Sequence, residues 1–232
     1  MKKIFIALAL ALLAVACSFS INPKRVVVIG NGKAAEKSFD LPAFTSIKVA
    51  GSSDVIYSQG PQAVVLTADE NLLDIYTVEV IEGTLRIGIK PGHSIKNRIS
   101  SFVTVSAPDL QGVKIAGSGE CVVKGGLKTT GNFSFAVSGS GDLEADSIAC
   151  KDFEAHISGS GDIEVAALTS ESASVLINGS GDAKLVCRDA GDITAKINGS
   201  GDIALLGTAR SLTSKVNGSG SINTKGLSLS AK

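Results

Sequence analysis

Aromatic residues are scarce in this chain of 232 residues, which contains no tryptophan and only two tyrosines. Its apolar residues make up 44% of the chain and are mainly valine, isoleucine, leucine and alanine, accompanied by 26 glycines. This composition favours many short strands and tight turns over long helices. The length and apolar content allow a substantial core, which excludes disorder for most of the chain. We therefore predict an all-β protein.

The chain also lacks an excess of charge, because 22 basic residues balance 22 acidic ones. Removal of Lys2 and Lys3 with a leader would leave 20 basic and 22 acidic residues, a net charge of −2. Phosphate binding normally needs a concentrated basic face. We therefore expect no nucleic acid among the partners.

Cysteine and histidine are too few to support a disulfide framework or a reactive centre. Three cysteines follow Cys17, namely Cys121, Cys150 and Cys187, and their odd number argues against complete pairing. They fall in different columns of the repeat described below, so we expect buried, reduced thiols. The two histidines are not accompanied by a Ser-His-Asp order or a metal-ligand spacing. We predict no catalytic residues, no metal and no cofactor.

Only one long hydrophobic run is present, from Ile4 to Val15, and Lys2 and Lys3 precede it. At about a dozen residues it is shorter than the roughly 20 that a transmembrane helix needs. Ala14-Val15-Ala16 then forms an A-x-A cleavage site, followed directly by Cys17. This order resembles a bacterial lipoprotein leader, in which Cys17 becomes the lipidated first residue.

The resemblance departs from the usual pattern at Ala14, where a leucine normally stands three residues before the cysteine. The alternative is ordinary signal-peptide cleavage, with Cys17 an incidental residue. We predict an exported outer-membrane lipoprotein, held to the membrane by its N-terminal lipid. Whether it faces the periplasm or the outside stays open.

A repeat of about 20 residues dominates the second half of the chain. Its marker is Gly-Ser-Gly followed by an acid, which begins at Gly117, Gly139, Gly159, Gly179 and Gly199, with a Gly-Ser-Gly-Ser variant at Gly218. The intervals are 22, 20, 20, 20 and 19 residues. A relative, Gly51-Ser52-Ser53-Asp54, begins 66 residues before Gly117.

Alignment on the glycines produces apolar columns. The column two residues before the block contains Ile115, Val137, Ile157, Ile177, Ile197 and Val216. Stacked coils would bring such equivalent residues together about 4.8 Å apart and bury them. An antiparallel meander is the alternative, but it would not keep one residue type in one column over consecutive units. We predict a right-handed parallel β-helix, or β-solenoid, with about 20 residues per rung.

The expected organisation has five parts. They are a signal peptide (1–16), a lipidated N-terminus and tether (17–36), an irregular N-terminal β portion (37–112), regular solenoid rungs (113–225) and a C-terminal tail (226–232). In the irregular portion, Thr77–Ile81 and Thr84–Ile89 are expected to pair through a tight Glu82-Gly83 turn. Such an antiparallel hairpin would cap the first rung, whose backbone groups would otherwise be unpaired.

One acid per rung occupies the same corner of the predicted solenoid. These repeat-corner acids are Glu120, Asp142, Asp162, Asp182 and Asp202. Neighbouring carboxylates about 4.8 Å apart repel one another, so they must be solvated, hydrogen-bonded or neutralised by cations. We favour a structural role in which they accept backbone N–H groups at the turn. The alternative is calcium binding, but one acid per rung leaves most of a calcium shell unsupplied.

Several segments resemble a known family. The likeness rests on Phe44–Val49 before Gly51-Ser52-Ser53-Asp54-Val55, on Asp69–Leu73, on Val78-Glu79-Val80 with Gly83-Thr84-Leu85, and on the Gly-Ser-Gly-Asp blocks. Over about residues 40–225, the chain resembles the putative auto-transporter adhesin head GIN domain family, common in Bacteroidetes. The resemblance implies a β-helical, often lipid-anchored envelope protein with an adhesion role, and it supplies no catalytic residues.

We therefore predict a cell-envelope lipoprotein that acts as a binding or adhesion scaffold for a glycan or a partner protein, and not an enzyme. Two alternatives stay open. One is a polysaccharide-processing β-helix enzyme, for which Glu144 and Glu164 on successive rungs are the available carboxylate pair. The other is a structural protein that self-associates end to end.

Overall fold

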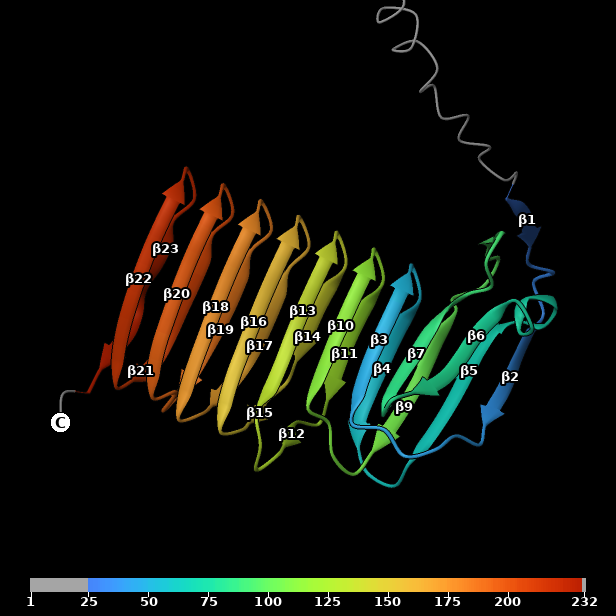
Figure 1. Cartoon of the computed structure of the whole chain (residues 1–232), viewed down its shortest axis with the longest axis horizontal. Coiled ribbons are helices and arrows are strands. Elements are labelled where there is room, and N and C mark those ends of the chain that lie inside the picture. Colours follow the sequence, from blue (N-terminus) through green and yellow to red (C-terminus); the bar gives the residue numbers. More distant parts are fainter. Residues whose placement is uncertain (1–24, 231–232) are drawn as a thin grey trace, which may run out of the picture.

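The computed structural model describes residues 25–230, of which most lie in β-strands. The strands wind into a parallel β-solenoid of about six turns, with about 20 residues per turn (Figure 1). This confirms the predicted β-solenoid. The predicted signal peptide and Cys17 lie outside the described residues. Residues 25–230 contain no helix with the length and apolarity needed to cross a membrane.

One wall of the solenoid is a nine-stranded sheet, whose strands lie side by side in Figure 1. In spatial order it consists of β6 (Tyr76–Ile81), β7 (Thr84–Ile89), β3 (Ser46–Gly51), β10 (Gly112–Gly117), β13 (Phe133–Gly139), β16 (Asp152–Gly159), β18 (Ser172–Gly179), β20 (Asp192–Gly199) and β22 (Ser211–Gly218). From β7 to β22 every neighbouring pair is parallel.

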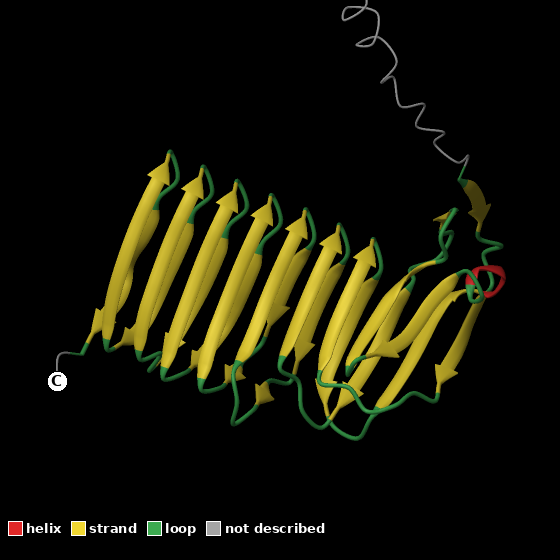
Figure 2. Ribbon diagram, in the orientation of Figure 1, coloured by secondary structure: helices red, strands yellow, loops and turns green. Residues whose placement is uncertain are grey.

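The opposite wall is a twelve-stranded sheet. Its main path consists of β2 (Ala34–Phe39), β5 (Ala63–Asp69), β9 (Phe102–Ala107), β4 (Asp54–Gln59), β11 (Glu120–Lys124), β14 (Asp142–Ala145), β17 (Ile163–Thr169), β19 (Ala183–Arg188), β21 (Ile203–Ala209) and β23 (Ile222–Leu229). Two short strands, β12 (Leu127–Lys128) and β15 (Ile148–Ala149), lie off this path. A separate pair, β1 (Val26–Ile29) with β8 (His93–Lys96), and a 3-10 turn, η1 (Glu70–Leu72), complete the described chain (Figure 2).

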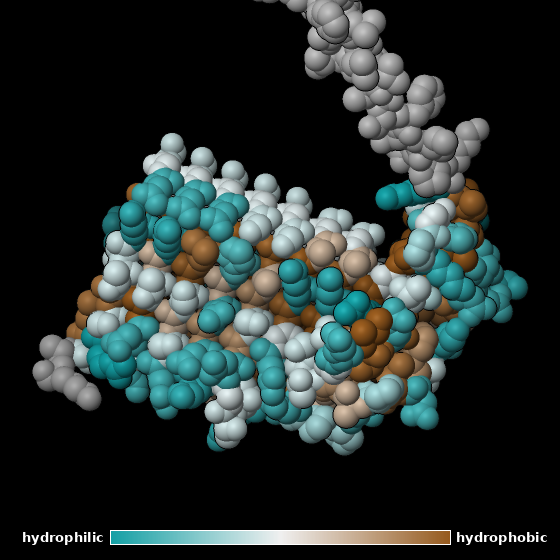
Figure 3. Space-filling view, in the orientation of Figure 1, coloured by the Kyte–Doolittle hydropathy of each residue, from teal (hydrophilic) through white to brown (hydrophobic). Residues whose placement is uncertain are grey.

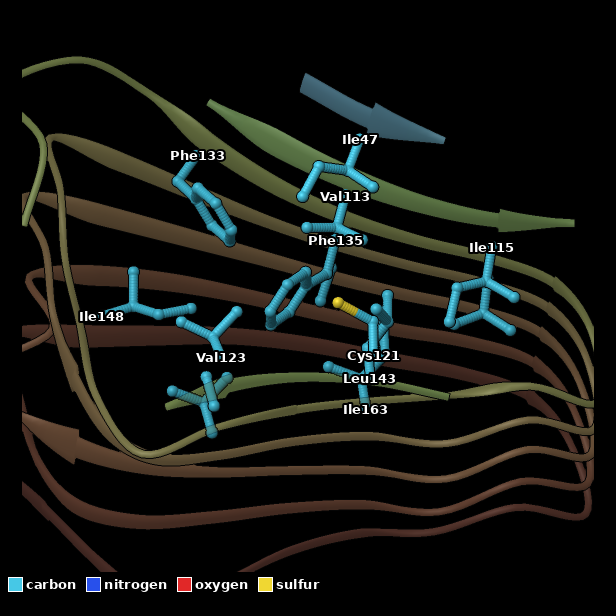
Figure 4. Close-up of a cluster of buried hydrophobic side chains, with 14 of the residues drawn as sticks. Ile47, Val113, Ile115, Cys121, Val123, Phe133, Phe135, Leu143, Ile148 and Ile163 are labelled. Carbon is cyan, nitrogen blue, oxygen red and sulfur yellow. The ribbon is translucent and has the colours of Figure 1, made fainter. Parts of the chain in front are cut away.

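The core lies between the two walls, because alternate side chains of each strand point inward. The predicted apolar columns are buried in the successive coils, and only the last coil exposes its members. Phe133 and Phe135 meet edge to face with their ring centroids 4.9 Å apart (Figure 4). Phe153 stacks on Phe133 with the centroids 6.4 Å apart. Each coil therefore packs against the next one as well as across the walls.

The glycine corners are required by the close stacking of the coils. Gly159 has φ 140°, a conformation that residues with a side chain rarely adopt. A Cβ atom at Gly161 would overlap the carbonyl oxygen of Gly141 in the preceding coil. The same overlap recurs along both glycine columns, so Gly-Ser-Gly marks the points where backbone lies directly on backbone.

The Gly51 block belongs to the same stack as the later blocks. Gly51 pairs in register with Gly117, so β3 and β4 lie beside β10 and β11 although about 50 residues separate the two coils in sequence. The intervening residues cover the N-terminal end of the stack. β6 and β7 form the predicted antiparallel hairpin, and its turn residues Glu82 (φ 51°) and Gly83 (φ 71°) both have positive φ, as a tight hairpin turn requires.

A buried aspartate holds the cap together. Asp69 at the end of β5 is fully buried, and its carboxylate accepts N–H groups of Gly32 (2.6 Å), Arg98 (2.9 Å) and Ile99 (3.4 Å). Burial by itself would raise the pKa of Asp69, but these N–H groups and the charge of Arg98 hold it below its ordinary value. The side chain thereby joins the segment before β2 to the segment before β9.

The C-terminal end of the stack has no comparable cover among the described residues. β22 and β23 are the last strands of the two sheets, and Val216 and Leu229 on them are 40% and 53% exposed. Equivalent positions one coil earlier, Ile197 and Ala209, are fully buried. The last coil thus presents both an open backbone edge and part of the core column.

Candidate functional surface

Figure 3 views the outer face of the nine-stranded sheet, on which the register of the parallel strands lines up the outward side chains in columns. One outward column is almost entirely small and polar and runs through Thr84, Ser46, Gly112, Ser134, Glu154, Ser174, Thr194 and Thr213. These residues point outward because their strand neighbours on both sides point into the core. The wall therefore displays hydroxyl groups at the spacing of the strands, about 4.8 Å.

A second outward column forms a ladder of hydrogen-bonded amides. Asn217 Nδ2 donates to Asn198 Oδ1 at 2.8 Å, and Asn198 Nδ2 donates to Asn178 Oδ1 at 2.7 Å. Asn178 Nδ2 lies 3.0 Å from His156 Nε2 of the neighbouring coil. These bonds orient the amides, so the ladder is ordered as a unit along the last coils.

The third outward column is charged at both ends. From the cap it runs through Arg86, Lys48, Lys114, Ala136, His156, Leu176, Lys196 and Lys215. No pattern described under the sequence had pointed to Arg86, Lys48 or Lys114. Lys48 and Lys114 each stand three residues before their glycine block, so alignment of Gly51 with Gly117 could have found them. Arg86 has no such marker.

The repeat-corner acids form a ladder of their own at the start of the opposite wall. Asp142 Oδ1 accepts the N–H of Asp162 at 2.9 Å, and Asp162 and Asp182 accept the N–H of the next acid at 2.7 Å. Asp202 ends the ladder by accepting the N–H and hydroxyl of Ser221. The carboxylates thus bind backbone of the following coil, and each bond fixes the spacing of two coils.

Glu120 departs from this pattern. The N–H of Asp142 donates to the carbonyl oxygen of Gly119 at 3.2 Å, while Asp54 accepts the N–H of Glu120 at 3.0 Å. Burial and the neighbouring carboxylates, chiefly Glu144, raise the pKa of Glu120.

Within residues 25–230, no three histidine, cysteine or acidic side chains are placed to hold a metal ion.

The carboxylate pair considered for catalysis lies on the outer face of the opposite wall. Glu144 and Glu164 are register partners on β14 and β17, next to a hollow of about 290 Å³ that Glu164 helps to line. Lys184 on the following strand forms an ion pair with Glu164, with Nζ 2.7 Å from Oε1. One member of the pair is thereby held by a cation.

The three cysteines within the described residues are free. Cys121 and Cys187 are buried, and Cys150 is partly buried. Burial raises the pKa of Cys121 to about 12, and burial is also the main reason why the pKa values of Cys150 and Cys187 rise to about 11. Such thiols are protonated at neutral pH and are poor nucleophiles.

Several solved structures share this fold. A protein of Bacteroides fragilis described as a putative adhesin aligns with a TM-score of 0.71 and 19% identity, over 84% of this chain and 99% of its own. A protein of Parabacteroides distasonis described as a putative lipid binding protein aligns with a TM-score of 0.62 and 23% identity, over 85% of this chain and 98% of its own. A protein of Parabacteroides merdae described as a putative adhesin aligns with a TM-score of 0.59 and 23% identity, over 85% of this chain and 98% of its own. At these identities the likeness concerns the fold alone.

Sequence comparison identifies the family. No protein with a curated description matches the chain. The family model described as "putative auto-transporter adhesin, head GIN domain" matches residues 43–171 and 157–231. These two matches cover well over half of the sequence and include every glycine block. The chain therefore belongs to the putative auto-transporter adhesin, head GIN domain family.

Proposed function

We propose that this chain is a lipid-anchored adhesion scaffold of the bacterial cell envelope that binds a glycan through the outer face of its nine-stranded sheet. The observation that carries the proposal is the column of mostly hydroxyl-bearing residues that crosses the strands of that face, with the amide ladder of the last coils and the cations near both ends beside it. A polymer of repeated units meets the same donors and acceptors from strand to strand, so weak contacts add along its length. The adhesin descriptions of the family and of two similar structures support the adhesion role.

The position of β1 supports the anchored arrangement. β1 lies at the capped end of the solenoid, away from the coils that end in β22 and β23 (Figure 1). Because Cys17 closely precedes β1 in sequence, a lipid on Cys17 would hold the capped end nearest the membrane. The long outer face would then extend outward from the envelope.

The binding role is tested by applying purified protein to a glycan array, in parallel with a polysaccharide-degradation assay. We expect selective retention on a subset of glycans without release of shorter products. Retention on no glycan, together with capture of a defined envelope protein, would instead identify a partner protein as the ligand.

The anchor is tested separately by metabolic labelling with a fatty-acid analogue. We expect the parent protein to be labelled and to partition with membranes, and Cys17→Ala to lose both properties. An unlabelled parent that partitions like the variant would exclude lipidation.

A polysaccharide-processing enzyme is the second candidate, favoured by the stacked carboxylates Glu144 and Glu164 beside a hollow. The Lys184 ion pair argues against it, because it binds one of the two carboxylates to a side chain of the same protein. Product formation that is abolished in Glu144→Gln and Glu164→Gln proteins would establish the enzyme. Turnover that survives both changes would exclude this site.

A self-associating structural protein is the third candidate, favoured by the open edge of the last coil. Edge strands that are unpaired on one side, with exposed Val216 and Leu229, are suited to pairing with another such edge. Sedimentation velocity over a range of concentrations tests this, because end-to-end pairing would raise the mean mass with concentration. A single monomeric species at all concentrations would exclude it.

A further inference from the structure

The solenoid register gathers three cations from distant parts of the sequence. Arg86 on β7 is the register partner of Lys48 on β3, and Lys48 is the partner of Lys114 on β10. They project from three adjacent strands on the outer face, where neighbouring strands are about 4.8 Å apart. Like charges directly opposite each other are unfavourable, so this row is costly to the fold without a counter-charge.

No ion pair within the described part of the chain neutralises this row. The ion pairs of that part are Lys37 with Asp74, Lys184 with Glu164, and Arg210 with Asp192, all away from the row. Glu79 on β6 is the register partner of Arg86 and lies opposite that end of the row, but the two form no ion pair. Lys48 and Lys114 have no acidic register partner. Arg86 and Lys114 are exposed and Lys48 is half-buried. The positive charge of the row is therefore available to a ligand.

The three cations line a concave part of the wall. A hollow of about 310 Å³ is lined by the row and by the hydroxyl-bearing residues Ser46, Thr84 and Ser134. Its floor is low because Gly112, which has no side chain, occupies the outward column between Ser46 and Ser134. A second hollow of about 180 Å³ also borders Lys48 and Arg86. We name this whole site, with its row of cations, the cationic hollow.

We infer that the cationic hollow binds an acidic polysaccharide, whose sugars carry carboxylate or sulfate groups. The inference rests on the proposed glycan-binding function and specifies its ligand. Ammonium and guanidinium groups form charge-assisted hydrogen bonds with such anions, and the hydroxyl-bearing residues pair with sugar hydroxyls. A polyanion suits the site better than a single anion because it brings successive charges along a row of successive cations.

Two double variants of equal charge change test the inference. R86E/K114E reverses two exposed members of the row, and K196E/K215E reverses two exposed cations of the same column near the other end. Binding of each protein to immobilised polyuronate, dextran sulfate and neutral dextran is measured at low and high salt. Vesicles containing phosphatidylglycerol form a further arm, and circular dichroism verifies folding. If R86E/K114E does not fold, K48Q takes its place, because it removes one positive charge of the row without introducing a negative one.

We expect the parent to prefer a polyanion over neutral dextran, with affinity falling as salt rises. R86E/K114E should weaken polyanion binding by about tenfold or more, and K196E/K215E should stay within about twofold of the parent. Unchanged binding by R86E/K114E, or by K48Q in its place, overturns the inference. Equal losses of polyanion binding in both double variants also overturn it, and so does binding of the parent to the vesicles but to no polysaccharide. If the parent binds neutral glycans only, the inference fails while the proposed function stands, whereas binding to no glycan at all removes both.

Discussion

At the scale of single residues, the corners of the solenoid combine two demands that the Gly-Ser-Gly-acid block meets together. The two glycines allow the backbone of one coil to lie against the carbonyl oxygens of the previous coil. The acid that follows accepts an N–H of the next coil in four successive instances, beginning at Asp142. The block recurs because every coil has to solve the same packing problem at the same corner.

Replacement of Asp162 by asparagine tests the acid ladder. The Asp162 carboxylate accepts the N–H of Asp182 at 2.7 Å, and an amide oxygen is a weaker acceptor. Because repulsion between neighbouring carboxylates is relieved at the same time, we expect a loss of only about 1 kcal/mol in the free energy of unfolding. Denaturation by urea measures this loss.

Calcium titration provides the contrasting outcome for the same ladder. The corner carboxylates already accept backbone N–H groups and supply too few oxygens to coordinate calcium. Added calcium should therefore not raise the melting temperature of the parent. A calcium-dependent rise that disappears in Asp162→Asn would show that the acids are ligands, because an ion that binds only the native state stabilises it.

The glycine corners predict opposite effects for two Gly→Ala changes. A Cβ atom at Gly161 would overlap the carbonyl oxygen of Gly141, so Gly161→Ala should cost about 3 kcal/mol or prevent folding. At Gly60 a Cβ atom meets nothing within 4 Å, and Gly60→Ala should be neutral or stabilise by about 0.5 kcal/mol. Thermal unfolding of both variants provides the comparison. Equal effects would contradict the stacking account.

The buried thiols predict a loss of stability in alkali. The folded-state pKa of Cys121, about 12, lies above its ordinary value of 9.0. The contribution of the protonated Cys121 thiol to the free energy of unfolding is therefore fully present below pH 9.0 and is lost as pH rises toward 12. Cys121→Val should flatten the decline, since the register partners Val55 and Leu143 show that the column accepts larger side chains. A decline as steep as in the parent would contradict this assignment.

Alkylation checks the state of the same cysteines. Under denaturing, non-reducing conditions all three should be modified, whereas the native protein should react slowly. A mass that shows a Cys150–Cys187 bridge would contradict the coil register.

At the scale of elements, the strands and the hairpin could be predicted from local patterns. Alternating apolar residues predicted the walls, and Glu82-Gly83 predicted the turn of the β6–β7 hairpin, because both signals depend on residues close in sequence. The parallel pairing of β3 with β10 could not be predicted from local patterns, because the residues of the cap separate the two strands in sequence. The role of Asp69 was equally hidden, since its three N–H partners come from segments 29 to 37 residues away.

Asp69→Asn tests whether that carboxylate secures the cap. The pKa of Asp69 lies below its ordinary value of 3.8, so its contribution to stability is present above pH 3.8 and is lost as pH falls through the folded-state value. The asparagine protein should be less stable at neutral pH and should lose less additional stability in acid. Urea unfolding over a series of pH values measures both effects. The exposed Asp40→Asn is the control, and identical behaviour of the two variants would contradict the role of Asp69.

At the scale of the whole molecule, the two walls differ in what they offer a ligand. The twelve-stranded wall uses its corner carboxylates and the Glu164–Lys184 pair to bind its own chain. The nine-stranded wall leaves hydroxyl columns and the cationic hollow open along the stack. Under the proposed function, this asymmetry would place adhesion on the nine-stranded wall and the anchor at the capped end near β1.

Steric blocking of each wall tests this claim most directly. Tyrosine is well tolerated in strands, so pairs of Tyr substitutions can cover a face without disturbing the core. Ser134→Tyr with Ser174→Tyr covers the nine-stranded wall, and Glu144→Tyr with Ala204→Tyr is the matched control on the opposite wall. On a glycan array, the first variant should lose the binding of the parent and the second should retain it. Retained binding in the first variant, with loss in the second, would contradict this claim.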